Sequence, residues 1–422
     1  MSIEGFQPNP TVEYLFLDLN SYFASVEQQV EPRLRGKPVA VLPSMTDATC
    51  AIAASYEAKA FGIKTGTKIY EAKRMCPDLI CVPARHDVYV DYHHRIFDEV
   101  ENHIHVTKIC SIDEAACLLA KQDRTPAAAT ILANQIKRGI YQNVGEAIKC
   151  SIGIAPNKFL AKTASDMQKP DGLTILEPGK LEAPMCRLKL TDLTGISKNM
   201  ERRLNYGGIY TVKDLWDVAP KHARRIWGGV GGERFWYKLH GYNVPDIETQ
   251  KSVIGHSRML DPKLRLEKEA YGVARYLTQK ASARLRRYEF YTRCFALSVK
   301  TPDGRKWRYD TTFPATQDSF RLLKILDILW QRMLREFDPG LLLKVSISFS
   351  GLQPAHLFTP DLFEDYKPRR KVDGQLSAAI DGLNKKHGKD TVAIGRVPKT
   401  KAGFVGTKIA FNRIPEREEF HE

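Results

Sequence analysis

The feature that most constrains this chain is an apolar run that ends in an acid. Residues Tyr14 to Leu17 predict a buried strand, Asp18 closes that strand, and a helical pattern begins at about Ser21. Such a succession favours a sheet packed against helices. A carboxylate at the end of a buried strand is costly unless a cation or a hydrogen-bond donor pairs with it. Taken alone, Asp18 could therefore cap the helix or bind a metal.

A second apolar stretch, Lys108 to Leu119, carries two adjacent acids, Asp113 and Glu114. We expect this stretch to form one strand of a hairpin. Carboxylates combined with substrate phosphates are typical of Mg2+ sites, and paired ions can stabilise both the attacking and the leaving oxygen of a phosphoryl transfer. Neighbouring strand residues face opposite sides, so both acids reach one site only at a turn or bulge. The spacing alone leaves that point open.

The chain has 422 residues, which is too long for one hydrophobic core, and its pattern changes along its length. Up to about residue 180, helices mix with a sheet. From about Leu181, glycines break short helices, as in Tyr206 to Ile209, which is typical of a helix-hairpin-helix unit or of an ordinary helical hairpin. A β, α, β, β, α, β order then predicts a small α+β domain. Beyond Gly351 we expect a polar tail in which the basic run Lys367 to Lys371 is a linker.

The charge of the chain indicates its class of partner. A net charge of +15 favours a polyanion, and nucleic acid fits better than a membrane surface. Between Lys251 and Gly351 basic residues outnumber acidic ones by about ten, so we expect this segment to grip DNA. The 8 cysteines contain no Cys-x-x-Cys pair and should be buried free thiols. No apolar stretch approaches the roughly 18 residues of a membrane span, and no signal-peptide pattern is present, so we expect a cytoplasmic protein.

Four successive segments resemble the motifs of Y-family DNA polymerases, the translesion polymerases of the DinB/UmuC type. They are Leu17 to Glu27, Ser55 to Ile63, Ser111 to Ala115 and Ala161 to Pro170. The resemblance covers about four-fifths of the chain, from Tyr14 to Gly351. It implies a template-directed polymerase that adds dNTPs to a primer 3'-hydroxyl in DNA repair, damage tolerance and the SOS response. The alternatives are a non-catalytic DNA-binding or clamp-recruiting accessory protein and another palm-bearing nucleotidyltransferase, such as a cyclase.

The resemblance also implies an α+β fold with a right-hand polymerase architecture. The palm would comprise residues 1–22 and 83–180, the small fingers 23–82, a helix-hairpin-helix thumb 181–246, an α+β little finger 247–352 and a C-terminal tail 353–422. Thumb and little finger would hold primer-template DNA through its phosphates, because a polymerase must tolerate any sequence. The chain would act as a monomer.

Carried over to this sequence, the resemblance makes Asp18, Asp113 and Glu114 the catalytic carboxylates. They would bind two Mg2+ ions, or Mn2+ in their place, with the backbone carbonyl of Leu19 as an added ligand. Glu114 would lie near the primer 3'-hydroxyl. The helix opening at Ser21 to Phe23, which includes Tyr22, would present backbone N–H groups to the triphosphate of the dNTP.

The same resemblance assigns side chains to a nucleotide pocket. Phe23 resembles the steric gate that excludes a ribose 2'-hydroxyl, although its pattern alone is that of a core aromatic. Tyr56 and Lys59 share a helix face and would contact the β and γ phosphates, and Lys162 resembles a further triphosphate lysine. Many family members have arginine in place of Lys59, and lysine offers a point charge where arginine offers a bidentate fork. A solvated basic face is the alternative for Lys162 and its neighbour Lys158.

Two Leu-Phe pairs near the C-terminus, Leu357-Phe358 and Leu362-Phe363, lie in stretches that resemble imperfect sliding-clamp-binding peptides. The alternative is a tail that packs these side chains on its own little finger. The segment Asp381 to Val392 resembles the C-terminal part of UmuC-like members, and the sequence gives it no role.

Overall fold

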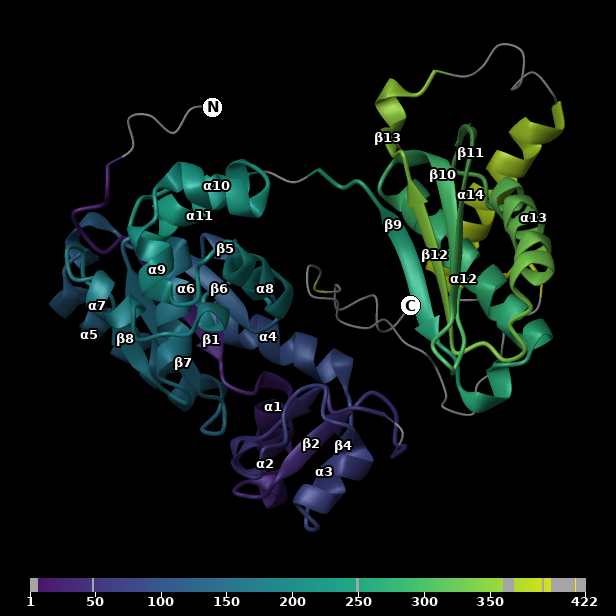
Figure 1. Ribbon diagram of the computed structural model, residues 1–422. Helices are drawn as coiled ribbons and strands as arrows, with labels where there is room; N and C mark the ends of the chain where they lie inside the picture. The colour runs from purple at the N-terminus through teal and green to yellow at the C-terminus, as the bar shows by residue number, and fades with distance from the viewer. Residues whose placement is uncertain are drawn as a thin grey trace. The chain divides into compact units, whose positions relative to one another are not determined.

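A computed structural model describes residues 7–47, 49–247, 250–359, 368–388, 391–395 and 414 of the chain. The chain forms two compact units, with the boundary between Asp246 and Ile247. The first unit contains a five-stranded sheet of order β5-β6-β1-β7-β8 and a three-stranded sheet of order β3-β2-β4 (Figure 1). The second unit contains a sheet of order β11-β10-β12-β9, with β13 paired to β10.

The strands of the first unit are β1 (Tyr14–Leu19), β2 (Val39–Leu42), β3 (Ala53–Ala54), β4 (Ile80–Pro83), β5 (Lys108–Ile109), β6 (Glu114–Leu118), β7 (Cys150–Ala155) and β8 (Leu173–Ile175). Its α-helices are α1 (Tyr22–Val30), α2 (Tyr56–Ala60), α3 (Ile69–Met75), α4 (His86–Glu101), α5 (Pro126–Gly139), α6 (Lys158–Met167), α7 (Glu182–Met185), α8 (Lys198–Tyr206), α9 (Val212–Asp217), α10 (Pro220–Trp227) and α11 (Val230–Leu239).

Strand β1 is the centre of the five-stranded sheet because both of its edges are paired. It runs antiparallel to β6 and to β7. Leu15 and Leu17 are buried in a core on one face, and Phe16 is buried in a second core on the other face, together with residues of α6. The predicted buried strand is confirmed. Asp18 follows Phe16 by two residues, so its side chain lies on the α6 side of the sheet.

Helix α6 lies very close to the sheet because β7 has a glycine, Gly153, at the crossing. A Cβ atom there would lie 2.0 Å from the carbonyl oxygen of Ala161, a contact no larger residue could keep. The N-terminus of α6 is capped by Asn157, whose side-chain oxygen accepts a hydrogen bond from the N–H of Leu160 at 2.9 Å. These contacts fix the helix that carries Lys162.

The expected single strand from Lys108 to Leu119 is wrong. The segment forms two short strands, β5 and β6, separated by a turn at residues 110–113. The N–H of Cys110 donates to the carbonyl oxygen of Glu114 at 2.8 Å, which closes the turn. The turn therefore falls where the two acids stand, and it breaks the strand alternation that would have pointed them apart.

Residues 181–246 form the expected short helices with glycine turns. Helix α8 ends at Gly207, and Gly208 has φ of +80°, a left-handed conformation that favours glycine. The N–H of Ile209 donates to the carbonyl oxygen of Leu204 at 3.0 Å and completes the turn.

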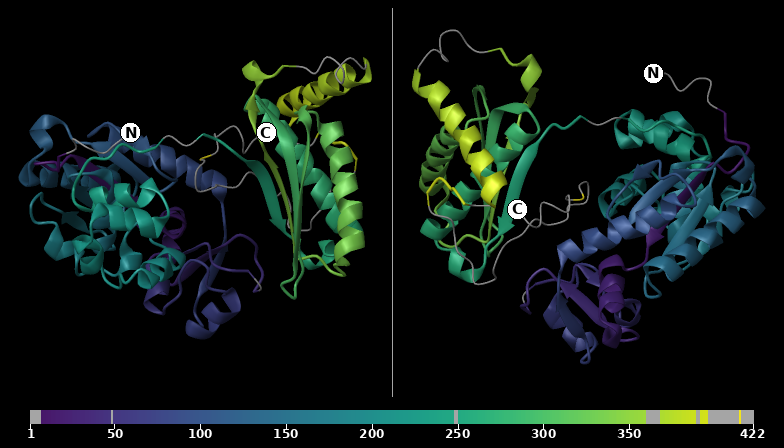
Figure 2. Two further views of the ribbon diagram at one scale, coloured as in Figure 1. Left: turned by 45° about the horizontal axis from the view of Figure 1, so that its top comes forward. Right: turned by 180° about the vertical axis from the view of Figure 1, so that it is seen from behind.

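The second unit has the predicted β, α, β, β, α, β order. Its elements are β9 (Ile254–Met259), α12 (Glu267–Arg287), β10 (Phe290–Lys300), β11 (Lys306–Thr316), α13 (Ser319–Phe337), β12 (Lys344–Ser350), β13 (Gln353–Pro354) and α14 (Pro368–His387). Helices α12 and α13 cover one face of the antiparallel sheet (Figure 2). Phe295, Phe349 and Trp330 are buried in the core between helices and sheet.

The linker expected at Lys367 to Lys371 is wrong, because a helix, α14, starts at Pro368. Arg286 of α12 donates to both carboxylate oxygens of Asp381, at 2.6 and 3.0 Å. Ser377, 1% exposed, donates to Asp318, the residue that caps α13, at 2.9 Å. These contacts stabilise a helix that the polar composition did not predict.

All 8 cysteines are free, but only Cys76, Cys117 and Cys150 are buried, so the prediction of buried thiols is wrong for the other five. Among the helices of the described residues, none is long and apolar enough to cross a membrane.

Candidate active site

Asp18 and Glu114 lie directly opposite each other on neighbouring antiparallel strands. The register pairs Asp18 of β1 with Glu114 of β6. Opposite residues of such a pair share one face of the sheet, so both side chains point to the same side. Asp18 is only 4% exposed, although it is a charged residue. The pairing of β1 with β6 thus brings together two carboxylates that are far apart in the sequence.

Asp113 joins them from the turn that precedes β6. Its carbonyl oxygen accepts a hydrogen bond from the N–H of Leu19 at 2.8 Å, which ties the turn to the end of β1. The hydroxyl of Ser111 donates to the Asp113 carboxylate at 2.5 Å. Nδ1 of the buried His93 on α4 lies 2.7 Å from the carbonyl oxygen of Ile112 and supports the turn from behind. The turn therefore allows the adjacent acids to converge, which the sequence left open.

The electrostatics of the three acids agree with this proximity. Burial raises the pKa of Asp113, and the charge of Asp18 raises it further, while the hydrogen bond from Ser111 opposes the change. Burial likewise raises the pKa of Glu114, with added repulsion from Asp18 and Asp113 and an opposing effect of Lys162. Neighbouring acids thus raise the pKa values of Asp113 and Glu114, so a positive charge close to these two carboxylates would be favourable.

Two lysines supply positive charge to this acid cluster. Lys162 of α6 contacts Asp18 and lies 2.9 Å from Glu114 and 3.2 Å from Asp166. Lys169 lies 2.7 Å from the other carboxylate oxygen of Asp18 and 2.8 Å from Asp166. Although burial opposes it, the neighbouring acids raise the pKa of both lysines, which are therefore charged at neutral pH.

The three predicted metal ligands do not form a ready-made coordination shell. In the described part of the chain, no three His, Cys, Asp or Glu side chains are arranged so that they could hold one metal ion. The ammonium groups of Lys162 and Lys169 lie against the Asp18 oxygens that a cation would use. Carboxylate oxygens are suitable ligands for a hard cation such as Mg2+, so the residue types fit a magnesium site. The ammonium groups of the two lysines provide the positive charge at these oxygens.

The start of α1 lies immediately after Asp18 and Leu19. Ser21 precedes the helix with φ of 49°, a left-handed conformation that is rare for serine. The Tyr22 hydroxyl donates to the carbonyl oxygen of Tyr89 at 2.6 Å, so its side chain is committed to the core. What Tyr22 can offer a ligand is its backbone at the helix N-terminus. Phe23 is half-buried and stacks on Tyr89.

Tyr56 and Lys59 share one face of α2, as expected. The Lys59 ammonium lies 4.3 Å from the centre of the Tyr56 ring. Burial raises the pKa of Tyr56, which the charge of Asp18 also raises and that of Lys169 lowers. Burial lowers the pKa of Lys59, Lys169 lowers it further, and Asp18 raises it. Both residues therefore feel the charges at Asp18 and Lys169, and α2 faces the acid cluster.

Lys169 was not predicted as a site residue, although it lies within the fourth family-like segment, Ala161 to Pro170. In the structure Lys169 forms an ion pair with the Asp18 carboxylate, and its charge lowers the pKa values of Tyr56 and Lys59. Lys158, which shares a helix face with Lys162, instead pairs with Asp246. The sequence shows Lys169 near the end of the segment Ala161 to Pro170. Only the fold shows that this lysine contacts Asp18 and Asp166.

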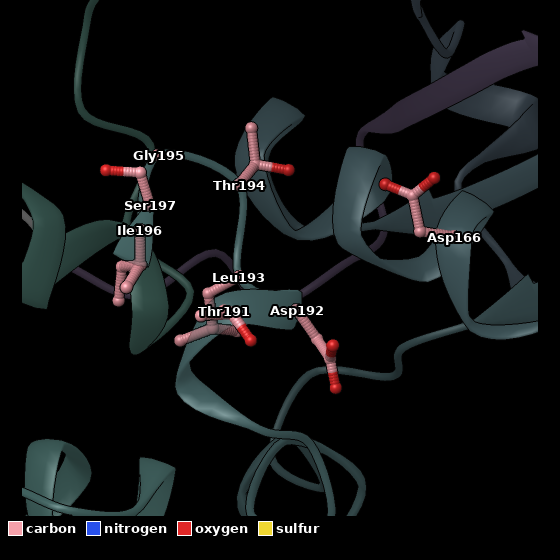
Figure 3. A pocket seen from close by; sticks show the side chains of 8 residues that line it. All are labelled: Asp166, Thr191, Asp192, Leu193, Thr194, Gly195, Ile196 and Ser197. Atoms are coloured by element: carbon pink, nitrogen blue, oxygen red, sulfur yellow. The ribbon is translucent and has the colours of Figure 1, made fainter. Parts of the chain in front are cut away.

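A pocket of about 360 Å3 is formed by α6 and the loop that precedes α8 (Figure 3). Its lining comprises Asp166 of α6 and the loop Thr191 to Ser197, which leads into α8. Asp166 connects the pocket to the cluster because its carboxylate also binds Lys162 and Lys169. The loop contributes a second carboxylate, that of Asp192, together with hydroxyl-bearing residues and the apolar residues Leu193 and Ile196.

The sheet of the second unit has one face that helices α12 and α13 leave uncovered. Along β12, Val345, Ile347 and Phe349 are buried under the helices, so the alternating serines face the other way. Ser346 lies between Ser257 of β9 and Ser298 of β10, and Arg308 follows on β11. This face, the serine face, carries Lys306 and Arg308 at its β11 edge, where Arg308 pairs with Asp310 at 3.1 Å.

Of the two candidate clamp-binding pairs, the structure describes Leu357-Phe358. Leu357 is 60% exposed, and the Phe358 ring stacks on Tyr291 with ring centres 3.8 Å apart. The pair Leu362-Phe363 lies outside the described residues.

The chain is similar to known proteins over most of its length. Residues 17–166 match the impB/mucB/samB family, and residues 250–362 match the impB/mucB/samB family C-terminal domain. DNA polymerase IV of Moorella thermoacetica is 33% identical over 387 residues, which cover 90% of this chain and 94% of that protein. DNA polymerase IV 1 of Bacillus subtilis is 33% identical over 303 residues, which cover 70% of this chain and 72% of that protein.

Solved structures share the fold. A Y-family DNA polymerase chimera of Dbh and Dpo4 superimposes with a TM-score of 0.69 and 23% identity, over 81% of this chain and 99% of the chimera. An insertion ternary complex of Dbh DNA polymerase superimposes with a TM-score of 0.53, also at 23% identity, over 81% of this chain and 99% of that chain. The predicted α+β polymerase fold is confirmed.

Proposed function

Since this chain belongs to the impB/mucB/samB family and is a Y-family, DNA-directed DNA polymerase of the translesion type, we propose that its acid cluster is the catalytic centre. The family dependence on a divalent metal and the substrates DNA and dNTP follow from this membership. The alternative, a non-catalytic accessory protein of the same fold, is not supported.

The observation that carries the proposal is the meeting of Asp18, Asp113 and Glu114 at the paired ends of β1 and β6. Two of the acids are register partners, and the third is tied to Leu19 by a backbone hydrogen bond. Burial raises the pKa values of Asp113 and Glu114, and the neighbouring acids raise them further, so this arrangement is costly for stability alone. Such strain is typical of a functional site.

The three carboxylates and the Leu19 carbonyl would hold two Mg2+ ions. The hard oxygen donors fit these ions, and Lys162 and Lys169 would have to leave the Asp18 oxygens to make room. When bound, the ions would neutralise the phosphates and favour ionisation of the primer hydroxyl.

The reaction is attack of the primer 3'-hydroxyl on the dNTP α-phosphate, with pyrophosphate as the leaving group. Glu114 would lie nearest the primer terminus, since Lys162 connects it to Asp166, which lines the pocket. The displaced Lys162 and Lys169 would be free to meet the triphosphate, together with Tyr56 and Lys59. Fixed positive charges of this kind accelerate phosphoryl transfer because they are in place before charge develops.

Phe23 would be the sugar gate. Its ring is half-buried at the second residue of α1, next to the backbone N–H groups that would meet the triphosphate. A ring below the sugar leaves no room for a 2'-hydroxyl, so ribonucleotides would be excluded by a clash.

The remaining parts would hold DNA. The loop Thr191 to Ser197 and the glycine turn at Gly208 would contact the primer backbone through N–H groups and hydroxyls. The serine face would lie against the duplex, because small side chains allow close approach of phosphates and Arg308 adds charge. We assign residues 1–22 and 83–180 to the palm, 23–82 to the fingers, 181–246 to the thumb and 247–352 to the little finger.

A contact with the sliding clamp through Leu357-Phe358 is a weaker proposal. Leu357 is exposed, whereas Phe358 would have to leave Tyr291 to enter a clamp pocket. We expect the polymerase to act as a monomer.

Primer extension with Mg2+ on undamaged and abasic templates tests the catalytic centre. We expect Asp113→Ala to lose activity by about 10^3-fold or more, as is usual when an essential catalytic group is removed. Asp98→Asn, an exposed acid of α4, is the control and should extend primers like the wild type. Equal activity of the wild type and Asp113→Ala would refute the assignment.

A further inference from the structure

The ring of Phe23 rests on a second aromatic ring, that of Tyr89 in α4. The two rings stack with their centres 4.3 Å apart and their planes 14° apart. The ring of His86 meets Phe23 edge-on at 6.2 Å, and the ring of Tyr22 lies at 5.7 Å. Tyr89 therefore sets the plane in which the Phe23 ring lies.

Tyr89 is itself held at two points. It is 0% exposed, its hydroxyl donates to Oε1 of Glu27 at 2.7 Å, and its backbone carbonyl accepts the hydroxyl of Tyr22. A buried ring with both a side-chain and a backbone anchor has little freedom to shift.

The anchor of the Tyr89 hydroxyl is an ion pair. Glu27 is 1% exposed, and Arg85 donates to both of its carboxylate oxygens, to Oε1 at 3.1 Å. The side chain of Arg85 is 33% exposed and, together with Glu27, lines a pocket of about 540 Å3. The bidentate pair offsets the cost of burying the Glu27 carboxylate and fixes its orientation.

Two contacts, Phe23 with Tyr89 and Glu27 with Arg85, join α1 to the start of α4 at matching sequence spacings. Phe23 and Glu27 are four residues apart on α1, and Arg85 and Tyr89 are four residues apart at the start of α4. Residues at this spacing lie on one helix face, so α1 presents the gate and its anchor together to α4.

We propose that Tyr89, oriented by the Glu27–Arg85 ion pair, is a positioning residue that sets how strictly Phe23 excludes ribonucleotides. The proposal rests on the role of Phe23 as sugar gate proposed above. A gate works by a clash, and a clash with a 2'-hydroxyl is relieved if the ring can retreat by a fraction of an ångström. Tyr89 lies directly behind the ring and blocks that retreat.

Single-nucleotide insertion kinetics on an undamaged template test this proposal. The readout is the ratio of kcat/KM for a dNTP to kcat/KM for the matching rNTP, in the wild type, Phe23→Ala, Tyr89→Leu, Tyr89→Phe and Glu27→Gln. We expect Tyr89→Leu to lower the ratio about 3- to 10-fold, which is the worth of a stacked aromatic pair. Tyr89→Phe and Glu27→Gln, which keep the core volume, should lower it about 2- to 5-fold through loss of the anchor. The rise in rNTP insertion should account for most of each change.

A double variant shows whether Tyr89 acts through Phe23. If it does, Phe23→Ala combined with Tyr89→Leu should discriminate like Phe23→Ala alone, within about twofold. A multiplicative loss in the double variant would overturn the proposal. The matched controls are Tyr92→Leu and Tyr92→Phe, since Tyr92 is a half-buried tyrosine of the same helix that packs against the same core. These controls should keep the wild-type ratio.

The outcomes separate this inference from the proposed function. An unchanged ratio in Phe23→Ala would refute the gate itself. A lowered ratio in Phe23→Ala with wild-type ratios in all the Tyr89 and Glu27 variants would overturn the inference and leave the gate intact. Equal losses of dNTP and rNTP insertion in the Tyr89 variants would mean a merely structural role and would also overturn it.

Discussion

The ammonium group of Lys169 lies 2.7 Å from a carboxylate oxygen of Asp18. The same lysine influences the pKa values of Tyr56 and Lys59, so it stands between the acid cluster and the proposed triphosphate pocket. Its charge is balanced by Asp18 and Asp166, and binding of cations at those acids would release it toward an anion.

We therefore expect Lys169→Ala to raise KM for the dNTP by about 10- to 100-fold, the usual worth of a hydrogen bond to a charged group. Steady-state insertion kinetics measure the change. Lys158→Ala is the control, because Lys158 is paired with Asp246 and should leave KM unchanged. If KM rises in Lys162→Ala and stays constant in Lys169→Ala, Lys162 alone is the triphosphate lysine.

The stability of the enzyme should depend on the protonation of His93. Burial lowers the pKa of His93 to about 4, with a smaller effect of His94 in the same direction and opposing effects of the Ile112 carbonyl and Asp98. The unfolded chain, with an ordinary histidine pKa of about 6.5, binds more protons than the folded one between these values. Stability from this group is therefore complete above pH 6.5 and is lost as the pH falls toward 4.

The expected loss over that window is about 3 kcal/mol from this one residue. Urea unfolding at pH 7 and pH 4.5 measures it. His93→Gln should lose less stability than the wild type between the two pH values, because it does not titrate. His105→Gln, which changes an exposed histidine, should keep the wild-type difference. Parallel pH profiles for the wild type and His93→Gln would contradict the prediction.

Local patterns were sufficient to predict much of the fold. The strand that ends at Asp18 and the β, α, β, β, α, β order of the second unit depend on apolar periodicity and turn residues, which the sequence displays directly. Helix α14 could not be predicted in this way. Its polar sequence forms a helix where Arg286 and Ser319 bind Asp381 and Ser377, and these partners are distant in the sequence.

The candidate site likewise has a part that the sequence predicts and a part that depends on distant contacts. Asp18, Asp113 and Glu114 could be named because acids in apolar strands are conspicuous and the surrounding segments resemble a known family. Their convergence could not be predicted, because it depends on the hydrogen bond from Leu19 to Asp113 across the sheet. The role of Lys169 was missed for the same reason, since only the packing of α6 on β7 decides which lysine reaches which acid.

That packing leads to a prediction about Gly153. A Cβ atom at this position would overlap the Ala161 carbonyl at 2.0 Å, and α6 would have to move away from the sheet. We expect Gly153→Ala to lower the free energy of unfolding by about 1–3 kcal/mol, as overpacked cores do, and to lower dNTP insertion because α6 carries Lys162. Gly231→Ala is the control: nothing lies within 4 Å of its Cβ position in α11, so it should be neutral or stabilising. Equal stability of the two variants would contradict the close approach.

The serine face offers a test of how the second unit holds DNA. Ser346 lies mid-sheet between Ser257 and Ser298, in line with Arg308, and its side chain points away from the helices. A carboxylate there would repel phosphates, so we expect Ser346→Glu to weaken primer-template binding about 3- to 10-fold at low salt, and less at high salt because ions screen the repulsion. Fluorescence anisotropy at two salt concentrations measures both effects. Gln331→Glu adds the same charge to an exposed position of α13, on the helix side, and should bind like the wild type. If both variants weaken binding equally, the effect comes from net charge, and the serine face is not the DNA contact.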